Sequence, residues 1–151
     1  MMACASLDCP VNNVVATRYG LQKPDGTPDT MGVDTLWAWT TRPDGTEVSL
    51  VNRLCGTKAT YFSISPSYTL PEDMVCLLVQ NDAGTFWKDT IWVTKEDYPH
   101  FEGVDCKASY FHTITGVKST HRLIDTVIIN KKTVDYDTST AHFLLRLKAR
   151  R

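Results

Sequence analysis

At 151 residues, 42% hydrophobic and 22% charged, the chain has the composition of one globular domain, which excludes a fibrous or largely disordered protein. Its longest apolar stretch, residues 74–79, is far shorter than the roughly 20 residues of a membrane-spanning helix, so no membrane partner is expected. The net charge of −1 hides an asymmetry. Residues 1–116 carry eight basic against fourteen acidic side chains, whereas residues 117–151 carry eight against three.

Three glycine-containing turns occur within the first 85 residues. Residues 24–27 and 43–46 share the sequence Pro-Asp-Gly-Thr, and residues 81–85 are a looser version, Asn-Asp-Ala-Gly-Thr. Proline presets the first corner, Asp or Asn bonds the nearby backbone, and Gly accepts a positive φ without steric cost. Each turn therefore predicts a connection between two antiparallel strands.

The segments between the turns are rich in Val, Thr, Ile, Tyr and Trp, which favour strands over helices. We expect strands at 12–21, 33–41, 46–54, 58–65, 74–80, 85–94, 106–115, 122–130 and 141–149. Residues 95–101 are expected to form a short helix, because Thr94 and Asp97 resemble a capping box, and a brief helical turn is expected at 71–73.

These elements predict an all-β fold: an antiparallel β-sandwich or jelly-roll-like barrel of about eight or nine short strands, with at most one or two short helices. No linker or composition shift divides the chain. We expect one β domain over residues 1–151, with residues 1–10 as a mobile N-terminus.

Four tryptophans are candidates for carbohydrate binding. In a strand, Trp37 and Trp39 share one face while Leu36 and Ala38 share the other. Exposed indoles bind the flat faces of sugars, but buried indoles fill the core of a sandwich, and the sequence favours the core. The complete candidate set is Trp37, Trp39, Trp87 and Trp92.

The last predicted strand alternates strictly. Phe143, Leu145 and Leu147 would face the core, while His142, Arg146 and Lys148 would face outward. A basic face of this kind suits nucleic acid or an acidic protein, whereas the alternative is a charged edge strand that blocks aggregation. The candidate binding residues are Arg122, Lys131, Lys132, Arg146, Lys148, Arg150 and Arg151.

Catalytic and metal-binding motifs are not recognisable. The chain lacks Gly-x-Ser-x-Gly, the phosphate loop and the dinucleotide fingerprint, so no catalytic residue is assigned and no cofactor is expected. No metal is assigned either, because the spacing of His100, Cys106, His112 and His121, and the lone pair Cys4 and Cys9, match no structural zinc pattern.

The cysteine count and the N-terminal residues indicate the cellular compartment of the protein. An odd set of five cannot pair completely within the chain, no glycosylation acceptor is present, and the first ten residues do not resemble a signal peptide. We therefore expect the cytoplasm or another reducing compartment, or association with a virion. The set is Cys4, Cys9, Cys55, Cys76 and Cys106.

Three functions remain open, and the sequence favours a noncatalytic protein over an enzyme. The first is a structural or interaction subunit that assembles with its own copies, as in a viral or phage-type particle, with its basic C-terminal third toward nucleic acid or an acidic protein. The second is a carbohydrate-binding, lectin-like module. The third is a small enzyme with dispersed catalytic residues, of which His112, His121 and Asp125 are the first to inspect.

Overall fold

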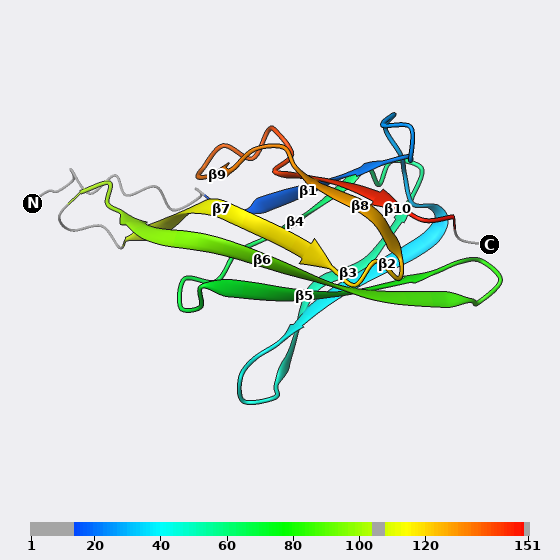
Figure 1. Ribbon diagram of the computed structural model, residues 1–151, viewed down its shortest axis with the longest axis horizontal. Helices are drawn as coiled ribbons and strands as arrows, with labels where there is room; N and C mark the ends of the chain where they lie inside the picture. Colours follow the sequence, from blue (N-terminus) through cyan, green and yellow to red (C-terminus); the bar gives the residue numbers. More distant parts are fainter. Residues whose placement is uncertain (1–13, 104–107, 150–151) are drawn as a thin grey trace, which may run out of the picture.

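Two β-sheets make up the fold in the computed structural model, which describes residues 14–103 and 108–149 (Figure 1). The all-β prediction is confirmed, and the described residues contain no helix. They consequently contain no helix that could cross a membrane. The predicted mobile segment, residues 1–10, lies outside the described residues.

All nine predicted strands are present, together with a two-residue tenth. In chain order they are β1 (Thr17–Gln22), β2 (Gly32–Thr41), β3 (Glu47–Gly56), β4 (Tyr61–Ile64), β5 (Glu72–Gln80), β6 (Phe86–His100), β7 (Ser109–Ser119), β8 (Ile124–Ile129), β9 (Thr133–Val134) and β10 (Phe143–Leu147). The smaller sheet has the order β4-β1-β10-β8, and the larger has the order β3-β2-β5-β6-β7-β9. Neighbours are antiparallel except β1 and β10, which run parallel.

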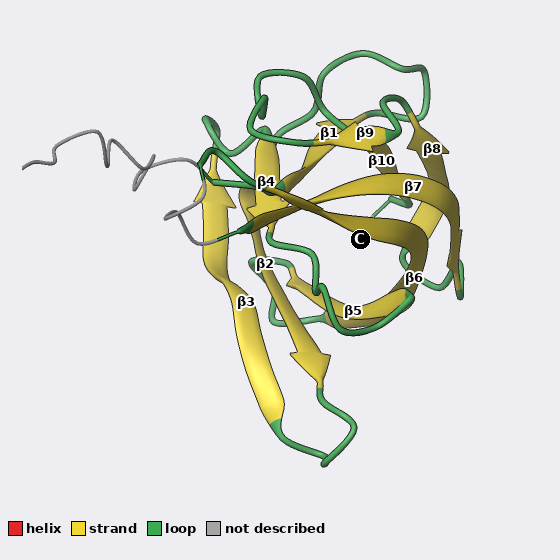
Figure 2. Cartoon of the chain, turned by 90° about the vertical axis from the view of Figure 1, so that its left-hand side faces the viewer, coloured by secondary structure: helices red, strands yellow, loops and turns green. Residues whose placement is uncertain are grey.

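The larger sheet curls around the core, and the β2–β3 hairpin projects beyond it (Figure 2). The core lies between the sheets, where the ring of Tyr19 stacks on Phe62 and Phe143 at centroid distances of 4.9 and 4.8 Å. The smaller sheet contributes all three rings. The larger sheet contributes mainly aliphatic side chains, among them Leu36 and Leu77, both with 0% exposure.

All three predicted turns form, and those at 43–46 and 81–85 join the antiparallel pairs β2–β3 and β5–β6, but the prediction is wrong for 24–27, which follows β1 and leads to β2 in the other sheet. Gly26, Gly45 and Gly84 have φ angles of 90°, 89° and 89°, which a residue with a Cβ rarely adopts. Asp25 accepts a hydrogen bond from the backbone N–H of Thr27, Asp44 accepts the same bond from Thr46, and in the third turn Asn81 accepts the backbone N–H of Thr85 four residues later. The repeated sequence motif thus produces a repeated local structure.

The predicted helix at 95–101 is wrong, because these residues continue β6 as far as His100. Their backbone pairs with β7 in a register that aligns Asp97 with His112. The Asp97 carboxylate bonds to the side chains of Lys95 and His112 rather than capping a helix. Long-range pairing has outweighed the local capping signal.

A buried carboxylate ties the two sheets together. Asp89 on β6 is only 3% exposed and accepts five hydrogen bonds, from the backbone N–H groups of Thr90, Thr120, Leu123 and Ile124 and from the Thr120 hydroxyl. Burial alone would raise the pKa of Asp89, but these bonds outweigh it and lower the pKa below its usual value. The connection between β7 and β8 is thereby fixed to β6.

Candidate functional site

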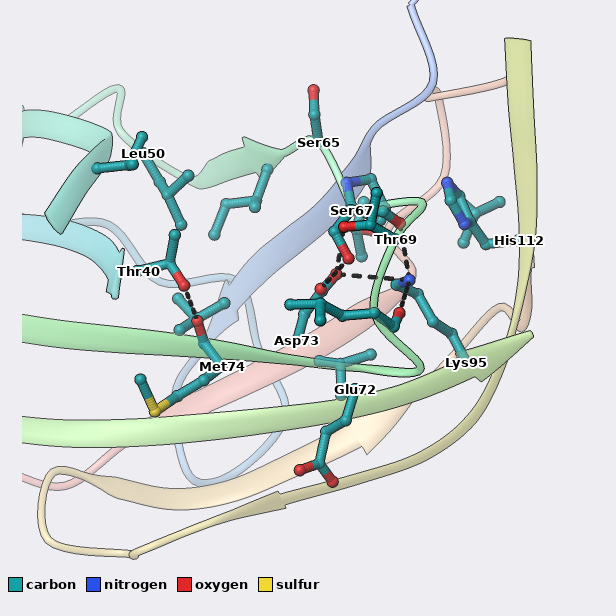
Figure 3. Close-up of a pocket in the computed structure, with 18 of the residues that line it drawn as sticks. Thr40, Leu50, Ser65, Ser67, Thr69, Glu72, Asp73, Met74, Lys95 and His112 are labelled. Carbon is teal, nitrogen blue, oxygen red and sulfur yellow. Dashed lines mark hydrogen bonds and ion pairs between the residues drawn. The ribbon is translucent and has the colours of Figure 1, made fainter. Parts of the chain in front are cut away.

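A cavity of about 480 Å³ opens between the sheets, at the end where β5 begins (Figure 3). Its rim is formed by the start of the β2–β3 turn and by the loop 65–71 between β4 and β5. Its walls are largely apolar and include Val48, Leu50, Ile64, Met74, Val75, Val93 and Ile114. The cavity therefore offers an apolar interior that remains reachable from solvent.

A buried lysine occupies one wall of this cavity. The side chain of Lys95, from β6, is 1% exposed. Its ammonium nitrogen donates to the carbonyl oxygens of Ser67 and Leu70, at 2.7 and 2.9 Å, and to the Asp97 carboxylate, at 2.8 and 3.0 Å. An ammonium has three hydrogens to donate, so these partners saturate it. Lys95 thus holds the loop 65–71 in place rather than reaching for a ligand.

Asp73 completes the fastening of this loop. Its carboxylate accepts the backbone N–H of Ser67 at 3.0 Å and the Ser67 hydroxyl at 2.5 Å, and it lies 3.9 Å from the Lys95 nitrogen. Figure 3 shows Ser67, Asp73 and Lys95 converging on one point of the wall. Because Asp73 and Lys95 both bond to the loop and lie close to each other, they hold the loop in a defined position.

Asp97 and His112 form a pair beside the lysine. Nδ1 of His112 lies 2.6 Å from a carboxylate oxygen of Asp97, and the imidazole is 2% exposed. Burial alone would raise the pKa of Asp97, but the bonds from Lys95 and His112 outweigh it and lower the pKa. The ionised carboxylate can only accept, so Nδ1 carries the proton and, in the neutral ring, Nε2 carries a lone pair.

His112 is a lining residue of the cavity, and Nε2 has no hydrogen-bond partner within the described ranges. The ring contacts Asp97, which pairs with Lys95, and Asp73 lies 3.9 Å from the Lys95 nitrogen, so this group of one ammonium and two carboxylates is net negative when the ring is neutral. The arrangement thus offers an acceptor to a hydrogen-bond donor and disfavours an anion.

The cationic residues predicted to form one face lie at two ends of β8. Lys148 adjoins the β7–β8 connection, where its nitrogen donates to the carbonyl of His121, next to the exposed Arg122. Lys131 and Lys132 follow the other end of β8, and Lys131 pairs with Asp137 at 3.2 Å.

Arg146 lies between these groups on β10, a strand inside the smaller sheet, where it donates to Gln22. Arg150 and Arg151 lie outside the described residues. Binding of nucleic acid or an acidic protein by these cations, and assembly with other copies, stay predictions.

His142 does not share the outward face predicted for it. It directly precedes β10, has 0% exposure and accepts the backbone N–H of Arg18 at Nδ1. Burial lowers the pKa of His142, and nearby Lys131 adds to the shift, outweighing the opposing effects of the Thr133 backbone, Asp135 and Asp137. The alternation fails here because it applies only within the strand, where Phe143, Leu145 and Leu147 do point inward.

The four tryptophans separate into two groups. Trp37, Trp39 and Trp92 lie on the outer face of the larger sheet, because their strand neighbours are buried on the inner face. Trp87 lies on the inner face of the same sheet and packs against the core. The prediction that Trp37 and Trp39 share one face is confirmed.

The other residues considered for catalysis are not brought to the cavity. His121 bonds to the carbonyl of Ile124 near the β7–β8 connection, and Asp125 is exposed on β8. Of His112, His121 and Asp125, only His112 lines the cavity. No metal-ligand cluster is formed among the described residues, and Cys4, Cys9 and Cys106 lie outside them.

Sequence reasoning did not identify Lys95, Asp97, Asp73 or Ser67 as a group. Ending the strand at residue 94 hid the signal that Lys95 follows Ile91 and Val93 at period two, on the buried face. A lysine at such a position needs buried partners and would have pointed to this wall.

Comparison with curated proteins gives no match, and comparison with solved structures gives none either. One family model does match, over residues 35–146, about three quarters of the chain. That span begins on β2 and ends on β10, so it includes the cavity walls contributed by β2, β3, β5, β6 and β7. The chain therefore belongs to DUF6452, a family of unknown function.

Proposed function

We propose that this chain is a noncatalytic binding protein whose inter-sheet cavity takes a small, mainly apolar molecule bearing a hydroxyl group. The observation that carries the proposal is the unpartnered Nε2 of His112 in a cavity whose walls are largely, but not wholly, apolar. Ligand sites in proteins are concave, mostly apolar, and contain few polar groups that fix the orientation of the ligand.

The apolar walls supply affinity. A cavity of about 480 Å³ falls within the range of roughly 300–1,000 Å³ typical of small-molecule sites. Each apolar group that leaves water for such walls contributes about 25 cal/mol per Å² of buried area. A flat aromatic or alicyclic molecule satisfies this requirement.

The polar wall supplies selectivity. Asp97 fixes the His112 tautomer, and Lys95 is fully engaged by protein groups, so Nε2 is a free acceptor that this wall offers to the ligand. A hydroxyl donates to it, an ether cannot, and a carboxylate meets the negative wall formed by Asp73 and Asp97.

Binding is favoured over catalysis by what surrounds the imidazole. Nucleophilic catalysis needs a hydroxyl or thiol within hydrogen-bond reach of the base. Among the described residues none makes such a bond to His112, and the nearby Ser67 hydroxyl donates to Asp73 instead. A small enzyme with dispersed residues stays a prediction.

Isothermal titration with three matched compounds tests the proposal: 2-naphthol, 2-methoxynaphthalene and 2-naphthoate. We expect 2-naphthol to bind about 2- to 10-fold more tightly than the ether, as one net hydrogen bond implies, and 2-naphthoate to bind most weakly. The variant His112→Asn keeps an N–H toward Asp97 but removes Nε2, so it should bind naphthol and ether equally.

Two further variants locate the site. Leu50→Trp fills the cavity from β3 and should abolish binding, whereas Asn52→Trp adds the same ring at an exposed position of that strand and should not. Circular dichroism checks that both variants fold. Unchanged binding by Leu50→Trp, or no preference for naphthol in the natural chain, contradicts the proposal.

A further inference from the structure

A second hollow lies on the outer face of the larger sheet, on the opposite side of the same strands. It measures about 420 Å³ and is lined by Trp37, Trp39, Leu78, Gln80 and Phe86. These residues come from the adjacent strands β2, β5 and β6. The inter-sheet cavity uses none of these five side chains.

The aromatic rings face outward for a simple reason. Leu36 and Ala38 are 0% and 1% exposed on the inner face, so the alternation of β2 sends Trp37 and Trp39 to the outer face. Two residues along a strand span about 6.8 Å, so the two indoles lie next to each other along β2. Phe86, 57% exposed, borders the hollow from β6.

Hydrogen-bonding side chains flank the rings in register. A row here is a set of three residues paired across β2, β5 and β6. Three successive rows are Thr35, Gln80 and Phe86; Trp37, Leu78 and Lys88; and Trp39, Cys76 and Thr90. Each row therefore contains one aromatic ring and at least one side chain that can form a hydrogen bond. Gln80 is held at the edge, where its amide nitrogen donates to the Gly84 carbonyl at 3.2 Å and leaves its oxygen to accept.

We propose that this hollow, which we call the outer tryptophan site, binds the pyranose rings of a β-linked gluco-oligosaccharide. Rings with equatorial hydroxyls have C–H groups on both faces and hydroxyls around the edge. The faces stack on Trp37 and Trp39, and the edge hydroxyls bond to Gln80 and Lys88.

Gln80 is the polar residue in the otherwise apolar lining, and the exposed Lys88 is paired with the lining residue Leu78, so hydrogen-bonding groups stand beside the rings. An apolar partner would cover the rings but would also remove Gln80 and Lys88 from water without giving them new partners, which is unfavourable. A polar partner without flat apolar faces would leave the indoles unused. A sugar satisfies both kinds of side chain at once.

Titration calorimetry with the β-1,4-linked glucose hexamer tests this inference. We expect measurable binding, weakened about tenfold or more by Trp37→Ala and by Trp39→Ala, because each removes one stacking ring. Gln80→Leu keeps the bulk of the side chain and removes the amide, and should also weaken binding. Trp87→Phe is the matched control, because Trp87 packs toward the core and should leave the affinity unchanged.

The results that overturn the inference are distinct from those that overturn the proposed function. Absence of hexamer binding, or equal binding by the natural chain and Trp37→Ala, removes the sugar site. Sedimentation that reveals self-association lost in Trp37→Ala would make a second copy the occupant instead. Leu50→Trp should leave hexamer binding intact, and Trp37→Ala should leave 2-naphthol binding intact, so each site is judged separately.

Discussion

Charged side chains on the two faces of β2, β5 and β6 have different environments: buried and paired on one face, exposed on the other. On the inner face, Lys95 and Asp97 are largely buried and closely partnered. On the outer face, Lys88 is exposed, and its nitrogen lies 6.0 Å from the ring of Phe86. A buried charge must therefore be fully paired by the fold itself, whereas an exposed charge remains available to a ligand.

The largest expected effect comes from removing the buried ammonium. Lys95→Met leaves the Asp97 carboxylate and the carbonyls of Ser67 and Leu70 without their donor, and breaking a buried ion pair costs about 3–5 kcal/mol. Urea denaturation should show this loss in the free energy of unfolding.

The matched variant on the outer face is Lys88→Met, which should change the same quantity by no more than about 0.5 kcal/mol, because this side chain is exposed. If Lys95→Met and Lys88→Met lose similar amounts of unfolding free energy, the proposed difference between the buried and the exposed lysine is wrong.

An intermediate effect is expected at Asp89, on the inner face of β6. Asp89→Asn keeps the shape but replaces one acceptor oxygen with an NH2 group, which only donates, so about 1.5–3 kcal/mol of stability should be lost at pH 7. Because the folded pKa of Asp89 lies below the unfolded value of about 3.9, its contribution is present above that pH and is lost as the pH falls.

The gap in unfolding free energy between natural chain and Asp89→Asn should therefore narrow below about pH 4. Urea denaturation at pH 7, 5 and 3 measures it. A gap that stays constant or widens in acid would show that the carboxylate charge is not the stabilising feature.

Much of this architecture follows from local chemistry that the sequence displays. The turns at Gly26, Gly45 and Gly84 depend on residues within five positions, and the outward direction of Trp37 and Trp39 depends only on the period of a strand. Such features are predictable because their causes are neighbours in the chain.

The cavity wall was not predictable in the same way. Lys95 contacts a loop more than twenty residues earlier, and Asp97 contacts His112 fifteen residues later, so the group exists only once β6 has paired with β5 and β7. A capping-box pattern at Thr94 and Asp97 even favoured the wrong element. Pairing between distant segments, rather than propensity, creates this site.

An effect on stability as small as that of Lys88→Met is expected at Phe86, whose substitution is the sharpest test of the outer face. Phe86→Ala removes a ring that is 57% exposed, so the free energy of unfolding should change by about 0.5 kcal/mol or less. If the outer tryptophan site binds sugar, the same change should weaken binding of the glucose hexamer severalfold, because the ring borders the hollow. Paired urea denaturation and calorimetry separate the two quantities. A variant that loses stability without losing affinity would assign Phe86 to packing, and one that loses neither would exclude Phe86 from the sugar site.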